Sequence, residues 1–142
     1  MIVLDTNIAS VIATPDHPDL PMVLAWQQAS RDQDFRITAI TRAEMAYGVA
    51  ILPAGARKTQ LTEVVARFWD AAAQDTLAFG QAEADAYGVI MAARRSSGRP
   101  MGVLDAQIAA TAFIAGAAVA TRNVGDFVDC GVPVVNPYGA VP

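Results

Sequence analysis

The sequence predicts an α/β protein in which helices cover a parallel sheet. Two observations favour this class. Short apolar segments typical of strands alternate along the chain with segments of helical periodicity, and no internal repeat, low-complexity tract or linker interrupts the alternation. The length of 142 residues suits one domain with its own core. We therefore expect a single domain over residues 1–142.

The amino-terminal half opens with the clearest strand. Residues 1–4 are all apolar, and Asp5-Thr6-Asn7 ends this strand before a helix that begins at Ile8. The segments expected next are a proline-rich loop at 15–21, a helix at 22–31, a strand at 35–40, and helices at 41–52 and 58–72. Two strands are thus expected in this half.

The carboxyl-terminal half continues the alternation. The expected segments are a strand at 76–79, helices at 81–96 and 105–116, and strands at 117–121 and 132–135. In the helix at 81–96, Tyr87, Ile90 and Met91 are expected to face the core. The helix at 105–116 consists mostly of small residues, which would let it lie close to the sheet.

The charge of the chain limits how it could hold a nucleic acid. The net charge is −4 and Lys58 is the one lysine, which counts against binding by broad electrostatic attraction. A local basic patch is still possible, because Arg94, Arg95 and Arg99 surround a Ser-Ser-Gly turn. These arginines could equally be solvated cations that complement the dipole of a helix end.

Several other kinds of site are not readable from the sequence. Cys130 is the one cysteine, so it can form no internal disulfide and no zinc motif, and we expect a buried or half-buried thiol. No motif ties a nucleophile to His17, the one histidine. No basic segment precedes the first strand and the apolar run at 108–120 is too short for a membrane span, so we expect a cytoplasmic protein.

Four acidic residues fall where strands meet helices. Asp5 follows the first strand, and Glu44 lies in the first turn of the helix after the second strand. Asp105 opens a helix, and Asp126 follows the strand at 117–121. Because ligands of open α/β sheets bind beyond the carboxyl ends of the strands, we expect these carboxylates to gather at one edge of the sheet.

Such a gathering points to a metal ion. Neighbouring carboxylates repel one another, and a divalent cation removes the conflict. Mg²⁺ and Mn²⁺ prefer oxygen ligands, and the chemistry they support is the metal-assisted hydrolysis of a phosphodiester.

Each acid also has a purely structural explanation. Thr41 and Glu44 have the spacing of a capping box. Asp105 could cap its helix, and Asp126 could be a turn residue. Asp5 is the hardest to explain in this way, because it directly follows four apolar residues, where an unpaired carboxylate is costly. Four such positions at one edge favour a site.

Four segments at these junctions form a recognisable set. In chain order they read MIVLDTN at 1–7, TAITRAEMAYG at 38–48, GRP at 98–100 with DAQIAA at 105–110, and TRN at 121–123 with DF at 126–127. LPAGARK at 52–58 and VNPY at 135–138 extend the set. Together these segments resemble the motifs of PIN domains, especially those of VapC-type and FitB-type toxins. The one departure is the apolar stretch directly before Asp105, which is more polar or smaller in many members of the family.

The resemblance implies a three-layer α/β/α sandwich with a short parallel sheet. It also implies a Mg²⁺- or Mn²⁺-dependent endoribonuclease that hydrolyses RNA with a metal-activated water. The catalytic acids carried over by position are Asp5, Glu44, Asp105 and Asp126, and the direct metal ligands among them are Asp5 and Asp105. The supporting polar residues carried over, which would orient the site or its substrate, are Asn7, Thr121 and Asn123. Thr6 is expected to provide no more than a hydroxyl at a helix start.

The resemblance also implies partners. Proteins of this type are usually toxins that dimerise and are blocked by the carboxyl-terminal segment of a small antitoxin. We therefore expect an RNA substrate, an antitoxin, a homodimer and no contact with a membrane. An apolar run could line the antitoxin groove or be buried in the core, and its members are Met45, Tyr47, Val49, Ile51 and Leu52.

Two other functions stay open. A receiver-type domain also gathers acids at a sheet edge and binds Mg²⁺, but it needs a lysine late in the sheet, whereas Lys58 lies mid-chain. An acyl-phosphate on Asp5 would revive this alternative. A catalytically inactive PIN-like module that only binds a partner is the second alternative, and the presence of all four acids argues against it.

Overall fold

Five parallel strands form the centre of the molecule. In the computed structural model, which describes residues 1–139, the strands are ordered β3-β2-β1-β4-β5. Their bounds are β1 (Ile2–Leu4), β2 (Phe35–Thr38), β3 (Thr76–Leu77), β4 (Ala118–Ala120) and β5 (Val134–Val135). All four strand pairs are parallel, so the α/β class with a short parallel sheet is confirmed.

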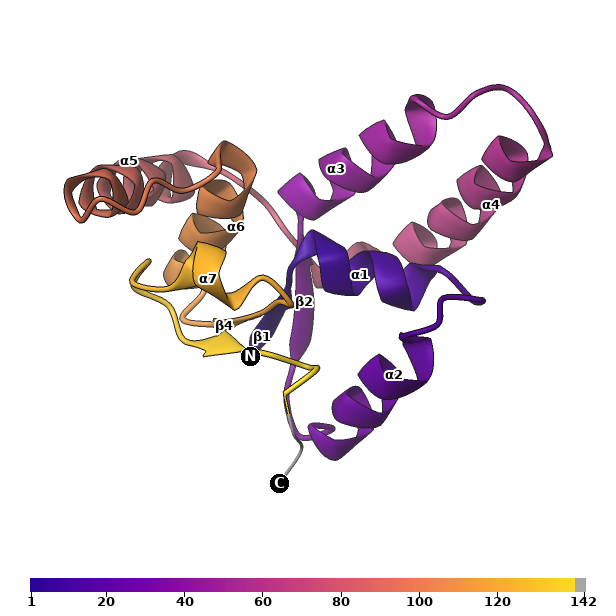
Figure 1. Ribbon diagram of the computed structural model, residues 1–142, viewed down its shortest axis with the longest axis horizontal. Helices are drawn as coiled ribbons and strands as arrows, with labels where there is room; N and C mark the ends of the chain where they lie inside the picture. The colour runs from indigo at the N-terminus through magenta and orange to yellow at the C-terminus, as the bar shows by residue number, and fades with distance from the viewer. Residues whose placement is uncertain (140–142) are drawn as a thin grey trace.

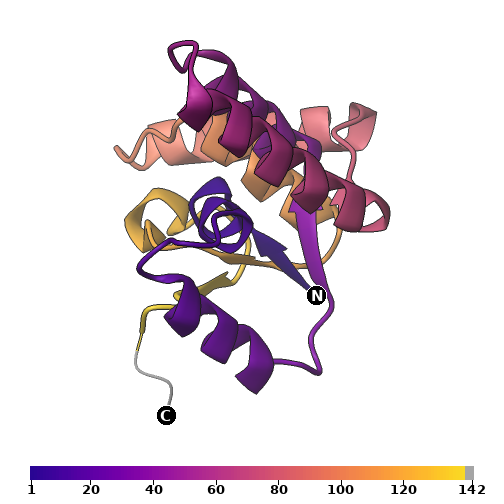
Figure 2. The same cartoon turned by 90° about the vertical axis from the view of Figure 1, so that its right-hand side faces the viewer.

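Helices cover both faces of this sheet. Their bounds are α1 (Thr6–Ala13), α2 (Leu20–Ala29), α3 (Ala39–Ala50), α4 (Ala56–Ala71), α5 (Gln81–Ser96), α6 (Val103–Ile114) and α7 (Val124–Phe127), with a single 3₁₀ turn, η1 (Ala73–Asp75), before β3. Helices α5, α6 and α7 gather on one side of the strands, and α1 to α4 lie on the other (Figure 1). In the perpendicular view, α1 again lies between α2 and the α3–α4 pair (Figure 2).

Strand β1 shows why its whole sequence is apolar. Ile2 and Leu4 pack into the core formed with α1, α2 and α4, whereas Val3 packs into the core formed with α5, α6 and α7. Successive side chains of a strand point to opposite faces, so a central strand covered on both faces needs an apolar residue at every position. The apolar strand therefore ends at Leu4, and the first polar residue, Asp5, follows it directly while still buried.

Helix α6 lies close to the sheet because its residues are small. Ala106, Ala109 and Ala110 have no exposed surface, and they belong to the same core as Val119 of β4. Ile90 of α5 is buried in this core as predicted, whereas Tyr87 and Met91 are only half-buried against it. In residues 1–139, no helix combines the length and the apolar character that a membrane span requires.

The differences from the expected elements lie at their ends. Helix α2 begins at Leu20, so Pro21 lies in its first turn, where a missing N–H leaves no helical hydrogen bond unmade. Strand β2 ends at Thr38 because this residue caps α3. Strand β3 contains only Thr76 and Leu77. The four-residue helix α7 was not predicted, since it is too short to show helical periodicity.

Candidate acidic site

Asp5 is the centre of the site. Its backbone N–H donates to the carbonyl oxygen of Ala120 at 3.0 Å, which extends the pairing of β1 with β4 by one residue. Its carboxylate Oδ1 accepts a hydrogen bond from the N–H of Thr6 at 2.7 Å and so caps α1. The residue is 4% exposed, so its charge is held almost out of contact with water.

The second oxygen of this carboxylate is held by two side chains. Asp5 Oδ2 accepts hydrogen bonds from Asn7 Nδ2 at 2.6 Å and from Thr121 Oγ1 at 2.7 Å. Asn7 Nδ2 also donates to Thr121 Oγ1 at 3.1 Å, and that hydroxyl accepts the backbone N–H of Asn123 at 3.0 Å. The three residues predicted as supporting thus lie in one network around Asp5, with Asn123 acting through its backbone.

Glu44 reaches the site from α3. The cap of this helix is Thr38, whose Oγ1 accepts the N–H of Thr41 at 3.0 Å, so the helix begins earlier than expected. The prediction that Glu44 lies in the first turn is therefore wrong, and so is the capping box. The Glu44 Oε2 atom instead accepts a hydrogen bond from the Thr6 hydroxyl. Thr6 was expected only to provide a hydroxyl at a helix start, so its contact with Glu44 goes beyond that expectation.

Asp105 and Asp126 come from the other layer of helices. Helix α6 is capped by Gly102, and Asp105 lies in the first turn, so Asp105 is not the capping residue. A Cβ on Gly102 would lie 2.8 Å from Asp105 Oδ2, which shows how closely this carboxylate approaches the chain. Asp126 lies in the first turn of α7, with its N–H donating to the carbonyl oxygen of Asn123 at 3.0 Å. It is an exposed helical residue rather than a turn residue.

Neighbouring carboxylates act electrostatically on Asp5 and Asp105. Burial raises the pKa of Asp5, and the charges of Glu44 and Asp126 raise it further, against the lowering effect of the hydrogen bonds from Thr121 and Thr6. Burial also raises the pKa of Asp105, and the charges of Asp5 and Asp126 add to this effect. The structure therefore brings together carboxylates that the sequence places as much as 121 residues apart, from Asp5 to Asp126.

The donor set suits a hydrated divalent cation. In residues 1–139, no three Asp, Glu, His or Cys side chains form a ready coordination group, so the site is not an all-protein cage. Mg²⁺ usually keeps several waters and is held by one or two carboxylates, and it would relieve the repulsion around Asp5. The residues present fit such an ion, with water completing its coordination.

Arg94 is a residue that the sequence reading misplaced. The sequence left open a local basic patch or a solvated cation at a helix end, and both interpretations placed Arg94 at the surface. In the structure it is 3% exposed, and its Nη1 donates to the carbonyl oxygen of Val128. Of the remaining patch, Arg99 is paired with Asp129 at 2.9 Å. The signal was available, because Arg94 lies four residues after the buried Ile90, on the same face of α5.

The one histidine and the one cysteine have local roles. His17 Nδ1 accepts the backbone N–H of Asp19 at 3.1 Å, which organises the loop between α1 and α2. Cys130 is buried, as predicted, and its thiol donates to the carbonyl oxygen of Phe127 at 2.7 Å. Burial raises the pKa of this thiol, so it is not a reactive thiolate at neutral pH.

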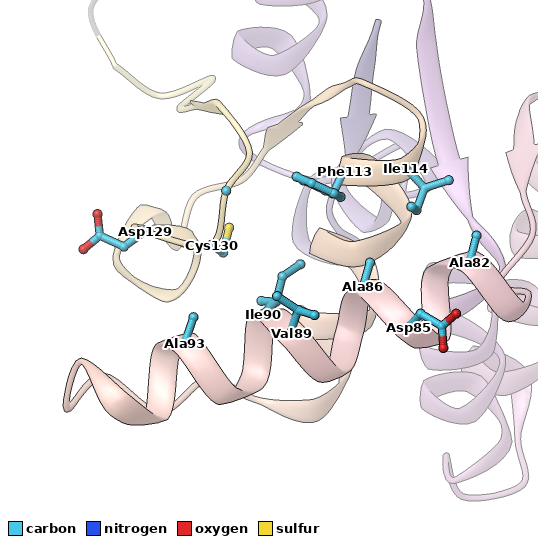
Figure 3. A pocket seen from close by; sticks show the side chains of 11 residues that line it. Ala82, Asp85, Ala86, Val89, Ile90, Ala93, Phe113, Ile114, Asp129 and Cys130 are labelled. Atoms are coloured by element: carbon cyan, nitrogen blue, oxygen red, sulfur yellow. The ribbon is translucent and has the colours of Figure 1, made fainter.

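Two grooves lie beside these elements. One, of about 580 Å³, runs between α5 and α6 and is lined by the exposed apolar residues Val89, Phe113 and Ile114 (Figure 3). It contains none of the four acids. The other, of about 240 Å³, lies between α1, α3 and α4 and is lined by Thr6 and Glu44 together with apolar side chains. Only the second groove therefore adjoins the acidic site.

Fold and site together define an α/β protein with carboxylates gathered at the strand exits of a parallel sheet. The PIN domain family matches residues 2–129, so the chain belongs to that family. Within the family it is similar to the VapC and FitB type.

Relatives over the whole length support this membership. The chain is 38% identical to VapC ribonuclease Y4jK of Sinorhizobium fredii, over 97% of this chain and 98% of that protein. It is 34% identical to toxin FitB of Neisseria gonorrhoeae, over 97% of this chain and 99% of that protein. The crystal structure of FitAcB from Neisseria gonorrhoeae contains a chain with a TM-score of 0.87 and 34% identity, covering 99% of this chain and 100% of that one.

Proposed function

We propose that this chain is a metal-dependent endoribonuclease and the toxin of a toxin–antitoxin pair. The observation that carries the proposal is the gathering of carboxylates around Asp5 and Asp105, where the charges of neighbouring acids, Glu44 and Asp126 among them, help to raise the pKa of both groups. Clustered acids with raised pKa values are typical of functional sites. Two of the relatives are named as a ribonuclease and as a toxin.

The metal ligands in this proposal are Asp5 and Asp105. The hydrogen bonds from Asn7, Thr121 and the Thr6 backbone hold the Asp5 carboxylate in one orientation. Oδ2 accepts two of them and Oδ1 accepts one, so Oδ1 keeps a lone pair for an ion. When bound, Mg²⁺ or Mn²⁺ would neutralise phosphate charge and lower the pKa of a water molecule.

Glu44 and Asp126 act on water and substrate in this account. The Thr6 hydroxyl occupies Glu44 Oε2, so Oε1 is free to accept a proton from an attacking water. Asp126 is exposed on α7, so its carboxylate can bind a second water molecule. Attack by the water oxygen forms a new O–P bond while the bond from phosphorus to the 3′ oxygen breaks. The products are a 5′ phosphate and a 3′ hydroxyl.

The groove beside Glu44 is the proposed site for the antitoxin. Met45, Val49 and Leu52 line it, so this part of the apolar run faces α1 and α4. A peptide segment seated there would lie against Glu44 and close the site to RNA. The cytoplasmic location expected from the sequence stays a prediction.

The rest of the apolar run is the proposed dimer surface. Tyr47 on α3 is 67% exposed, and Ile51, which directly follows the last residue of α3, is 62% exposed. Large apolar side chains with that exposure are typical of interfaces between copies of a chain.

A receiver-type function has no support in the structure. Lys58 Nζ donates to the carbonyl oxygens of Ala50 at 2.7 Å and Leu52 at 3.2 Å. It therefore binds the carboxyl end of α3, whereas Glu44 lies nearer the middle of that helix and Asp5 lies at the start of α1. A lysine in this position does not reach a phosphoryl group on Asp5.

The test is cleavage of total RNA by purified protein, with and without Mg²⁺ or Mn²⁺, beside Asp5→Asn and the matched control Asp85→Asn on exposed α5. We expect metal-dependent cleavage by the wild type and by Asp85→Asn, and none by Asp5→Asn. Ends carrying 2′,3′-cyclic phosphate would contradict the proposed hydrolysis. A folded wild type that cuts nothing with any metal would favour the binding-module alternative.

A further inference from the structure

Arg122 is tied directly to the acidic site. It follows Thr121, and its backbone N–H donates to Asn7 Oδ1 at 3.2 Å. Asn7 in turn holds the Asp5 carboxylate, so the backbone of Arg122 is fixed relative to that carboxylate through one side chain. The backbone of Arg122 is therefore held beside the acidic site.

The side chain of Arg122 contacts Tyr138 near the carboxyl terminus. Its guanidinium carbon lies 5.9 Å from the centroid of the Tyr138 ring, which is a cation–π contact. Its Nη1 lies 3.8 Å from Asp19 Oδ2, and the Tyr138 hydroxyl donates to that same oxygen at 3.3 Å. The Arg122 side chain is nevertheless 58% exposed, so the guanidinium still faces water.

The contact between Arg122 and Asp19 is weak, so a phosphate group could replace Asp19 as the partner of the guanidinium. A pair at 3.8 Å with an exposed arginine contributes little in water. The planar guanidinium has five donors and matches a phosphate with two parallel hydrogen bonds, which is a stronger arrangement. Asp19 and Tyr138 therefore position the guanidinium but leave most of its hydrogen-bond donors available.

Five of the chain's nine other lysine and arginine residues are engaged elsewhere. Their partners are Asp34 and Asp75 for Arg36, Asp129 for Arg99, the Trp69 ring for Arg42, and helix carbonyls for Lys58, while Arg94 is buried. An RNA strand approaching four carboxylates in a chain of net charge −4 needs a positive contact beside them. Arg122 is a cation with that position.

We propose that Arg122, supported by Tyr138 and Asp19, binds a phosphate of the RNA strand next to the scissile bond and so positions the strand over the acids. It is a positioning residue, because it contacts the substrate without taking part in bond breaking. The proposal rests on the proposed nuclease function and adds to it the residue that overcomes the repulsion between the site and the RNA backbone.

The test measures binding of a fluorescent single-stranded RNA pool by anisotropy at several salt concentrations. All variants carry Asp5→Asn to prevent cleavage. Arg122→Gln is compared with Arg122→Lys and with the matched control Arg31→Gln, an exposed arginine that precedes β2 at the opposite edge of the sheet. We expect Arg122→Gln to weaken binding about tenfold at low salt and to reduce the salt slope by roughly 0.7, the value for one phosphate contact on a single strand.

The lysine variant and the arginine control separate a phosphate contact from a merely structural role. Arg122→Lys keeps the charge and should restore most of the salt slope, and Arg31→Gln should match its parent. Equal affinity and equal slope for Arg122→Gln and Arg31→Gln would overturn the inference. Metal-dependent cleavage of the same pool by the protein with Asp5 intact tests the nuclease function separately: cleavage without dependence on Arg122 refutes only the phosphate contact.

Discussion

At the scale of single residues, the question is how a buried carboxylate is tolerated. An ionised group at 4% exposure is costly unless it is hydrogen-bonded. Asp5 accepts hydrogen bonds from a backbone N–H, an amide and a hydroxyl, and only the last two come from side chains. Thr121 provides the hydroxyl and is itself fully buried, so it has no alternative partner in water.

This arrangement predicts the effect of Thr121→Val, which keeps the shape and removes the donor. Asp5 would lose a hydrogen bond in a buried position, so we expect a loss of roughly 1–3 kcal/mol in the free energy of unfolding, measured with urea. Affinity for Mn²⁺ should fall by about 10- to 100-fold, because the carboxylate would lose its fixed orientation. Thr121→Ser should keep both properties near wild type. A valine variant with unchanged metal affinity would show that the hydroxyl does not orient Asp5.

Asp5 and the residues around it could be predicted from the sequence, but the contacts between them could not. A carboxylate placed directly after four apolar residues is visible as an anomaly in the chain itself. The bond between Thr6 and Glu44 joins residues 38 positions apart, and no local pattern encodes it. Arg122 lies within the motif at 121–123, but the sequence assigns it no role, because its contact with Tyr138 forms only in the folded chain.

At the scale of elements, the start of α3 positions Glu44. Thr38 and Thr41 both have capping chemistry, and the sequence alone favoured Thr41 because Glu44 completes a capping box. In the structure Thr38 ends β2 and caps α3 at once, and its Oγ1 also lies 3.1 Å from Thr41 Oγ1. The type and order of the expected helices and strands were correct, and only α7 and the short turn η1 were missed. The other errors concern the ends of elements, as where Thr38 belongs to both β2 and the cap of α3.

The cap predicts the result of Thr38→Ala. The N–H of Thr41 would lose its buried acceptor, and we expect a loss of about 1–2 kcal/mol in the free energy of unfolding. RNA cleavage should also fall, because the first turns of α3 orient Glu44. Thr59→Ala on exposed α4 is the matched control, and it should change the free energy of unfolding by less than about 0.5 kcal/mol. Equal effects of the two substitutions on stability and cleavage would contradict the role given to this cap.

At the scale of the whole molecule, the order of the strands in the sheet determines which residues meet at the acidic site. Strand β1 lies between β2 and β4, so Asp5 emerges at the centre of the exit edge. Glu44 reaches it from α3, whereas Asp105 and Asp126 come from α6 and α7 on the other side (Figure 1). The sequence predicted that the strand exits would meet at one edge, but strand order is not written in any local pattern. The site therefore depends on both helical layers being in place.

The most direct test of this account is a calorimetric titration of the purified protein with Mn²⁺. The wild type should bind the ion, and Asp85→Asn, which removes a remote charge, should bind it equally. Asp5→Asn should bind it at least about tenfold more weakly, because it removes the central ligand. If Asp5→Asn binds Mn²⁺ as tightly as the wild type does, the carboxylate centre is not the metal site and the account is wrong.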